Sequence, residues 1–146
     1  MKRTFALAGL LRLRHLQQDQ AAGDLAQANA TAQANLARRA EARATLEQTP
    51  SLASGAATLA AIASARASAN RMLADVDALG RNYQVLLGEA QVTYDRTRAD
   101  SVRLEKLEGR HGALVVADDL HREQAVLDEI ASTGWHRNGS MGGDPR

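Results

Sequence analysis

The sequence predicts an all-α protein: a two-helix antiparallel coiled-coil hairpin with unequal arms and a disordered C-terminal tail. Leucines recur at multiples of seven residues on both sides of one proline: Leu11, Leu25 and Leu46 before Pro50, and Leu59, Leu73 and Leu87 after it. A helix returns a residue to the same face after seven positions, so this repeat marks a seam that another helix covers. Only four residues are aromatic (one Trp, two Tyr and one Phe), so we expect a long, narrow seam instead of a large globular core.

The first helix is expected over about residues 5–47 and the turn over about residues 48–56. Pro50 cannot continue a helix without losing a backbone hydrogen bond, and Ser54 and Gly55 accept the dihedral angles of a reversal. Two polar residues, Gln18 and Arg39, interrupt the seam expected on this helix. Its other members are Leu11, Ala21, Leu25, Ala28, Ala32, Ala42 and Leu46. Such small residues allow close approach but bury little apolar area.

The second helix is expected over about residues 57–131. A second seam row lies three residues after its leucine row: Ile62, Ala69, Val76, Tyr83 and Ala90. Gly80 and Gly88 each cost about 1 kcal/mol relative to Ala in a helix interior, so we expect bending near them. Residues 134–146 are rich in Gly, Ser and Asn without periodicity, which predicts a disordered tail after a single hairpin domain over 1–133.

The two arms have different lengths, so the second helix is expected to extend past the first. An antiparallel fold about Ser51 and Leu52 places Phe5 opposite roughly residue 99. From Ser101 onward, the apolar residues then have no expected partner within the chain. These residues are Leu104, Leu107, Leu114, Leu120, Leu127 and Ile130. They require another protein or another copy of this one.

Composition argues against several kinds of function. The net charge of +1 gives no overall drive toward nucleic acid or acidic membranes, and the absence of cysteine removes thiolate sites. The four histidines are His15, His111, His121 and His136. None forms the i, i+4 ligand pair of helical metal sites, and Asp118 and Arg122 are expected to form an ordinary ion pair. We therefore expect no enzymatic activity, no metal, no cofactor and no nucleic-acid partner.

Membrane insertion is not expected either. The apolar run that starts at Phe5 is cut short by Arg12 and Arg14, which predicts the first turns of a helix instead of a signal peptide. No stretch of about 18 consecutive apolar residues occurs, so no transmembrane helix is expected.

Three short motifs carry a family resemblance. They are Phe5-x-Leu7-x-x-Leu10-Leu11-x-Leu13-Arg14, then Leu104-Glu105-Lys106-Leu107, then Arg122-Glu123-Gln124-x-x-Leu127-Asp128-Glu129-Ile130-Ala131. In this order, and with unequal arms, they make the chain similar to the flagellar export protein FliJ family over roughly residues 3–132. The chain departs from the family in its high alanine content, in Gln17 and Gln18 where acidic residues are frequent, and in Gly109 and Gly112.

The resemblance implies a soluble, cytoplasmic component of the bacterial flagellar type III protein export apparatus, peripheral at the inner face of the cell membrane at the flagellar base. Members of that family form a coiled coil similar to the central stalk of rotary ATPases. They bind the export ATPase (FliI-like), promote assembly of its ring, and contact the export gate protein (FlhA-like) and export chaperones. The family uses no cofactor, and its membrane association runs through the export apparatus alone.

The resemblance also suggests partner-binding residues. The end expected to enter the ATPase ring comprises Phe5, Leu11, Leu104, Leu107, Leu114, Leu120, Leu127, Asp128 and Glu129. For the export gate, Leu59 and Ile62 are candidates by their location after the turn alone.

Two other classes of protein remain as alternatives. One is a generic structural coiled-coil or amphipathic-helix scaffold that self-associates; the narrow, alanine-filled seam favours helix partners over a membrane surface. The other is a metal-binding or catalytic four-helix domain made by dimerisation, but the chain lacks the inward Glu and Glu-x-x-His ligands of such bundles.

Overall fold

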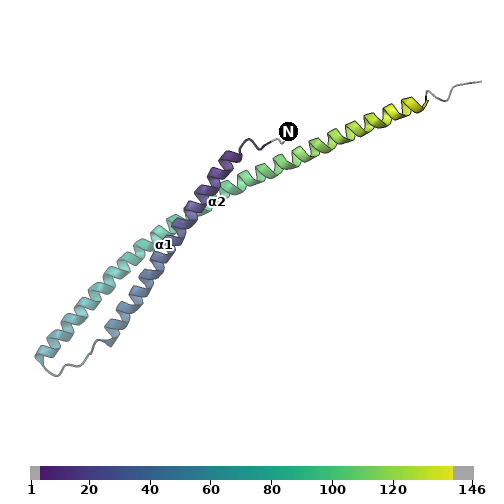
Figure 1. Cartoon of the computed structure of the whole chain (residues 1–146). Helices are drawn as coiled ribbons and strands as arrows, with labels where there is room; N and C mark the ends of the chain where they lie inside the picture. The colour runs from purple at the N-terminus through teal and green to yellow at the C-terminus, as the bar shows by residue number, and fades with distance from the viewer. Residues whose placement is uncertain (1–3, 140–146) are drawn as a thin grey trace, which may run out of the picture. The chain divides into compact units, whose positions relative to one another are not determined.

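The computed structural model describes residues 4–139, with side chains described through Trp135. Two helices, α1 (Ala8–Gln48) and α2 (Ala56–Gly139), pack against each other, and no strand occurs in the described part of the chain (Figure 1). The predicted all-α hairpin is therefore confirmed. The chain divides into two compact units: unit 2 is Leu13–Ser101, and unit 1 combines Met1–Arg12 with Val102–Arg146.

In unit 2, α1 and α2 meet along a heptad seam. Buried or half-buried residues recur on α1 at alternating spacings of three and four: Arg14, Gln18, Ala21, Leu25, Ala28, Ala32, Asn35, Arg39, Ala42 and Leu46. The same spacing on α2 selects Ala69, Leu73, Val76, Gly80, Tyr83, Leu87, Ala90, Tyr94, Thr97 and Ser101. This spacing keeps one stripe of each helix facing the other. The seam residues predicted for unit 2 are confirmed with two exceptions: Leu59 is exposed, and Ile62 is half-buried but precedes the observed seam.

The register of the two helices differs from the expected one. Arg14 forms an ion pair of 3.4 Å with Asp100, and the Asn35 side-chain amide donates to the Val76 carbonyl and occupies the space beside Gly80. Folding about Ser51 and Leu52 would instead put Asn35 level with roughly residue 69, about three helical turns earlier along α2. The expected register is therefore wrong.

The path of the connection explains the difference in register. Residues 49–55 join the helices as an irregular segment, and all of residues 51–61 are exposed. An extended segment of this length spans about 23 Å, more than the roughly 16 Å that three turns of helix rise. The connection therefore runs alongside the first turns of α2, and α1 pairs only with later residues of α2. A tight turn would instead pair α2 with α1 from its first residue.

In unit 1, the N-terminal residues pack on α2. The Phe5 ring lies 5.6 Å from the His111 ring, at an interplanar angle of 37°, and Leu11 is buried. Phe5 therefore lies against His111 and not opposite residue 99. The helix begins at Ala8, whose backbone N–H donates to the Phe5 carbonyl at 3.1 Å, three residues later than expected.

The end of α2 runs further than predicted. The helix continues to Gly139, so residues 132–139 are helical where the pattern was expected to end near 131 and a tail to begin at 134. Within this stretch, the Thr133 hydroxyl donates to the Glu129 carbonyl at 2.9 Å, and no proline occurs before Pro145 to stop the helix. The other residues of the expected tail, 140–146, lie outside the described residues. Across the described helices, no segment is apolar enough over a sufficient length to cross a membrane.

Candidate partner-binding surfaces

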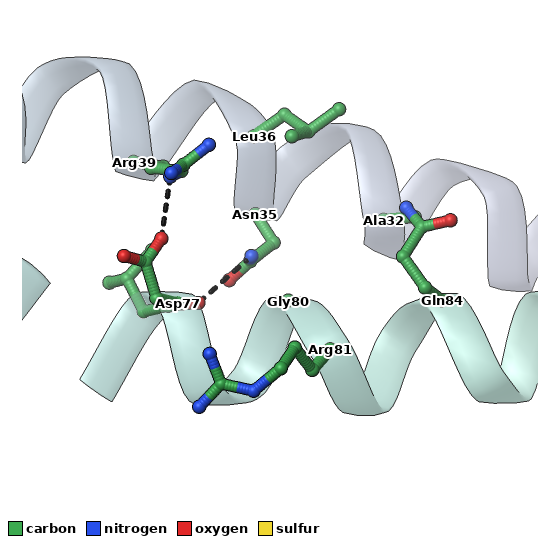
Figure 2. A pocket seen from close by; sticks show the side chains of 9 residues that line it. Ala32, Asn35, Leu36, Arg39, Asp77, Gly80, Arg81 and Gln84 are labelled. Carbon is green, nitrogen blue, oxygen red and sulfur yellow. Dashed lines mark hydrogen bonds and ion pairs between the residues drawn. The ribbon is translucent and has the colours of Figure 1, made fainter. Parts of the chain in front are cut away.

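The centre of the unit 2 seam holds a buried polar contact between Asn35 and Gly80. Asn35 is only 4% exposed, and its Nδ2 donates to the Val76 carbonyl at 3.1 Å (Figure 2). A Cβ atom at Gly80 would lie 2.8 Å from the same Nδ2. The Asn35 side chain therefore occupies the space that a side chain at position 80 would fill. This explains why α2 carries a glycine within its seam and remains helical through it, although we expected bending near Gly80.

A groove of about 430 Å³ opens beside this contact. Arg39 forms an ion pair with Asp77 across its floor, as Figure 2 shows. The Asn35 Oδ1 is buried and has no hydrogen-bond partner among the described residues. Arg81 and Gln84 also line the groove, and its lining contains no serine, threonine, cysteine or histidine. The one carboxylate of the groove, that of Asp77, is paired with Arg39, so the polar groups here hold the two helices together.

The ion pair of Arg39 with Asp77 is expected to contribute little to stability. Both side chains are at least one-third exposed, and exposed pairs contribute at most about 1 kcal/mol. Asp77→Asn should therefore lower the free energy of unfolding, measured by urea titration, by less than about 1 kcal/mol, and high salt should shrink the difference. Asp75→Asn, at an exposed position with no ion pair recorded among the described side chains, is the matched control. A larger, salt-independent loss would contradict this assignment.

A second groove, of about 750 Å³, follows the seam toward Tyr94. Small residues leave it open on both helices: Ala22 and Ala26 on α1, and Gly88 on α2. Its remaining lining consists of Leu25, Asn29, Gln84, Leu87, Gln91 and Tyr94. No charged group lines this groove. We attribute it to the small side chains of the seam, which fill little of the space between the two helices.

The residues predicted for the ATPase end divide into two groups. Phe5 and Leu11 pack within unit 1, and Leu104 is half-buried there. The expectation that the apolar residues after Ser101 lack an intramolecular partner is therefore wrong for the first of them, Leu104. The other members are exposed: Leu107, Leu114, Leu120, Leu127, Asp128 and Glu129.

The end of α2 carries a second heptad pattern, displaced from the seam residues Leu104, His111 and Val115. Spacings of three and four alternate through Ala113, Val116, Leu120, Glu123, Leu127, Ile130 and Gly134. We call these seven positions the distal seam. Its four large apolar side chains are each more than half exposed. Residues at these spacings share one helix face, so the distal seam is an apolar stripe about 32 Å long without a covering helix in the described part of the chain.

The charge around the distal seam is acidic. Residues 113–135 contain five carboxylates and one arginine. Arg122 is held by Asp118 at 2.7 Å and by Asp119 at 3.8 Å, so the predicted pair of Asp118 and Arg122 is confirmed. For Glu123, Asp128 and Glu129, no ion pair is recorded among the described side chains. The end of α2 therefore presents an apolar stripe flanked mainly by negatively charged side chains.

The residues proposed for the export gate lie at the start of α2. Leu59 is more than half exposed and precedes the paired seam, whereas Ile62 is half-buried. Of the two, only Leu59 offers a large apolar surface to another protein.

No group of three His, Cys, Asp or Glu side chains that could hold a metal ion occurs among the described residues. His111 packs against Phe5, and within residues 4–135 its buried Nε2 has no hydrogen-bond partner. Because His111 lies in the seam against Phe5, we assign it a packing role.

Sequence reasoning missed Asn35 and underused Glu123. Asn35 lies three residues after Ala32 and four before Arg39, so seam spacing alone would have placed it. The expected seam includes only two polar positions, Gln18 and Arg39, and omits Asn35 between them. Glu123 lies inside the distal seam by the same rule, but it had been considered only as part of a motif.

Comparison with known proteins adds no further assignment. The chain matches no protein-family profile, no curated protein and no solved structure.

Proposed function

We propose that this chain is a FliJ-type component of the flagellar type III protein export apparatus: a stalk-like coiled coil that binds the export ATPase, promotes assembly of its ring, and links it to the export gate and substrate chaperones. The observation that supports the proposal most strongly is the inequality of the helices. α2 has 84 residues and α1 has 41, so a paired seam coexists with an apolar helical end that no other described segment covers. A ring with a central pore is one kind of structure that accommodates such an end.

The exposed members of the predicted ATPase end fit this role. Leu114, Leu120 and Leu127 provide apolar surface, while Asp128 and Glu129 provide negative charge for basic groups around a pore. Export chaperones and the gate protein would bind other surfaces, with Leu59 as the accessible gate candidate. Membrane association is indirect in this proposal, because it runs through the export apparatus at the inner face of the cell membrane.

The test is the rate of ATP hydrolysis by the purified export ATPase of the same bacterium, with and without this protein at substoichiometric amounts. Ring assembly is followed in parallel by electron microscopy. We expect faster hydrolysis and more complete rings, because one stalk organises several ATPase subunits. No binding to the ATPase, with helical content and solution mass unchanged, would contradict the proposal and favour a generic coiled-coil scaffold.

A further inference from the structure

The distal seam contains one charged residue in line with its leucines. Glu123 lies three residues after Leu120 and four before Leu127, so the three side chains share one helix face. Glu123 also lines a shallow hollow with Arg122, Val126 and Leu127. Any helix that covers this stripe must therefore accommodate a carboxylate at the centre of an otherwise apolar contact.

A carboxylate within a heptad seam selects among partners. Desolvating an unpaired charge is costly, whereas a cation placed opposite it compensates part of that cost. A single polar residue at a seam position is a known means of fixing register and partner choice in coiled coils. Since no ion pair is recorded for Glu123 among the described side chains, its compensating charge would come from the partner.

A second copy of this chain fits the distal seam poorly. In a parallel pair, each Glu123 faces its counterpart. In an antiparallel pair centred on the stripe, the two Glu123 side chains again meet, and Asp119 lies level with Asp128 of the other copy. Like charges at facing positions disfavour association, so the pattern argues against self-pairing.

We propose that the distal seam forms a coiled coil with a helix of another protein, whose own heptad seam presents Lys or Arg opposite Glu123. The acidic surroundings favour further Lys or Arg residues beside the partner's seam, by charge complementarity. The inference rests on the proposed function in that it assigns partner chemistry to the same exposed end, but its physical test requires no ATPase.

The test uses full-length protein and three synthetic helical peptides of roughly four heptads, free of tryptophan, with leucine at every seam position except the central one. The central residue is Lys, Leu or Glu. Trp135 is the only tryptophan in the chain and lies at the end of α2, so its emission reports binding. We expect the Lys peptide to bind at least about tenfold more tightly than the Glu peptide, and more weakly as salt is raised. Equal affinities, or no binding by any peptide, would overturn the proposal.

A charge reversal provides the control. Glu123→Lys should invert the preference, so that the Glu peptide binds more tightly than the Lys peptide, whereas Asp95→Lys, in the paired part of α2, should leave it unchanged. An unaltered preference in Glu123→Lys would contradict a seam position for this residue.

Self-association provides a second control. Glu123→Leu removes the charge that opposes self-pairing, so we expect sedimentation velocity to show a concentration-dependent dimer that the wild-type protein does not form. A wild-type dimer through the distal seam would overturn the proposal.

The outcomes separate this inference from the proposed function. If the peptides behave as expected but the export ATPase is not stimulated, the proposed function fails and the partner chemistry stands. If the ATPase is stimulated and Glu123→Lys stimulates it equally, the inference fails alone.

Discussion

A chain ending at Gly112 should retain its paired helices and lose stimulation of the export ATPase. This truncation keeps every cross-helix contact described above, including that of Phe5 with His111 and the ion pair of Arg14 with Asp100. It removes all seven positions of the distal seam. Because the removed side chains are largely exposed, the free energy of unfolding should change by less than about 1 kcal/mol. Stimulation should fall more than about tenfold, since the apolar side chains that anchor the partner are gone.

The two readouts make the truncation interpretable. Urea titration followed by circular dichroism shows whether the paired helices persist, and ATP hydrolysis shows whether the end of α2 is required. Full stimulation by the truncated chain would assign ATPase binding to another surface. Loss of both stability and stimulation would indicate that residues after Gly112 support the fold, which the exposure of this segment does not predict.

Gly80 and Gly88, both in α2, should respond oppositely to replacement by alanine. At Gly80, a Cβ would lie 2.8 Å from Asn35 Nδ2, so the buried amide must rotate away from the Val76 carbonyl. Losing this hydrogen bond and crowding the seam outweigh the better helix propensity, so Gly80→Ala should lower the free energy of unfolding by about 1–2 kcal/mol. At Gly88, no atom lies within 4 Å of a new Cβ. Gly88→Ala should therefore raise the free energy of unfolding by about 1 kcal/mol.

A double-mutant cycle identifies the cause of the Gly80 effect. Asn35→Ala removes the amide that occupies the space at position 80, so Gly80→Ala in that background should be neutral or stabilising. The coupling free energy should be about 1–3 kcal/mol, in the range typical of residues in direct contact. Additive effects in urea titrations would mean that the glycine is not required by Asn35.

The heptad rows could be predicted from sequence, but the register could not. Periodicity identifies which residues of each helix face the seam, and this prediction held for Leu25, Leu73 and Leu87. Periodicity does not distinguish registers that differ by one heptad. Sliding α2 by seven residues would place Asn35 against Leu73 and leave a buried amide without a partner, which is costly. The match of Asn35 with Gly80 therefore selects one register, and it becomes visible only when polar and glycine seam positions are paired.

The path of the connection was the other unpredictable feature. Pro50 and Gly55 mark where the helices stop, but they do not determine whether the chain reverses tightly or runs along α2. Because the connection takes the longer path, Leu104 and His111 lie in the paired part of α2, and the exposed end begins later than expected. The predicted ATPase end consequently mixed packing residues such as Leu11 with surface residues such as Leu127.

Site-specific crosslinking tests most directly whether the end of α2 is the surface that binds the export ATPase. The chain contains no cysteine, so Leu127→Cys and Leu59→Cys each introduce a unique site for a photoactivatable crosslinker at an exposed position of α2. Our account predicts that Leu127→Cys crosslinks to the assembled ATPase ring and that Leu59→Cys does not. Crosslinking from Leu59→Cys alone would contradict it, because the ATPase would then bind at the start of α2.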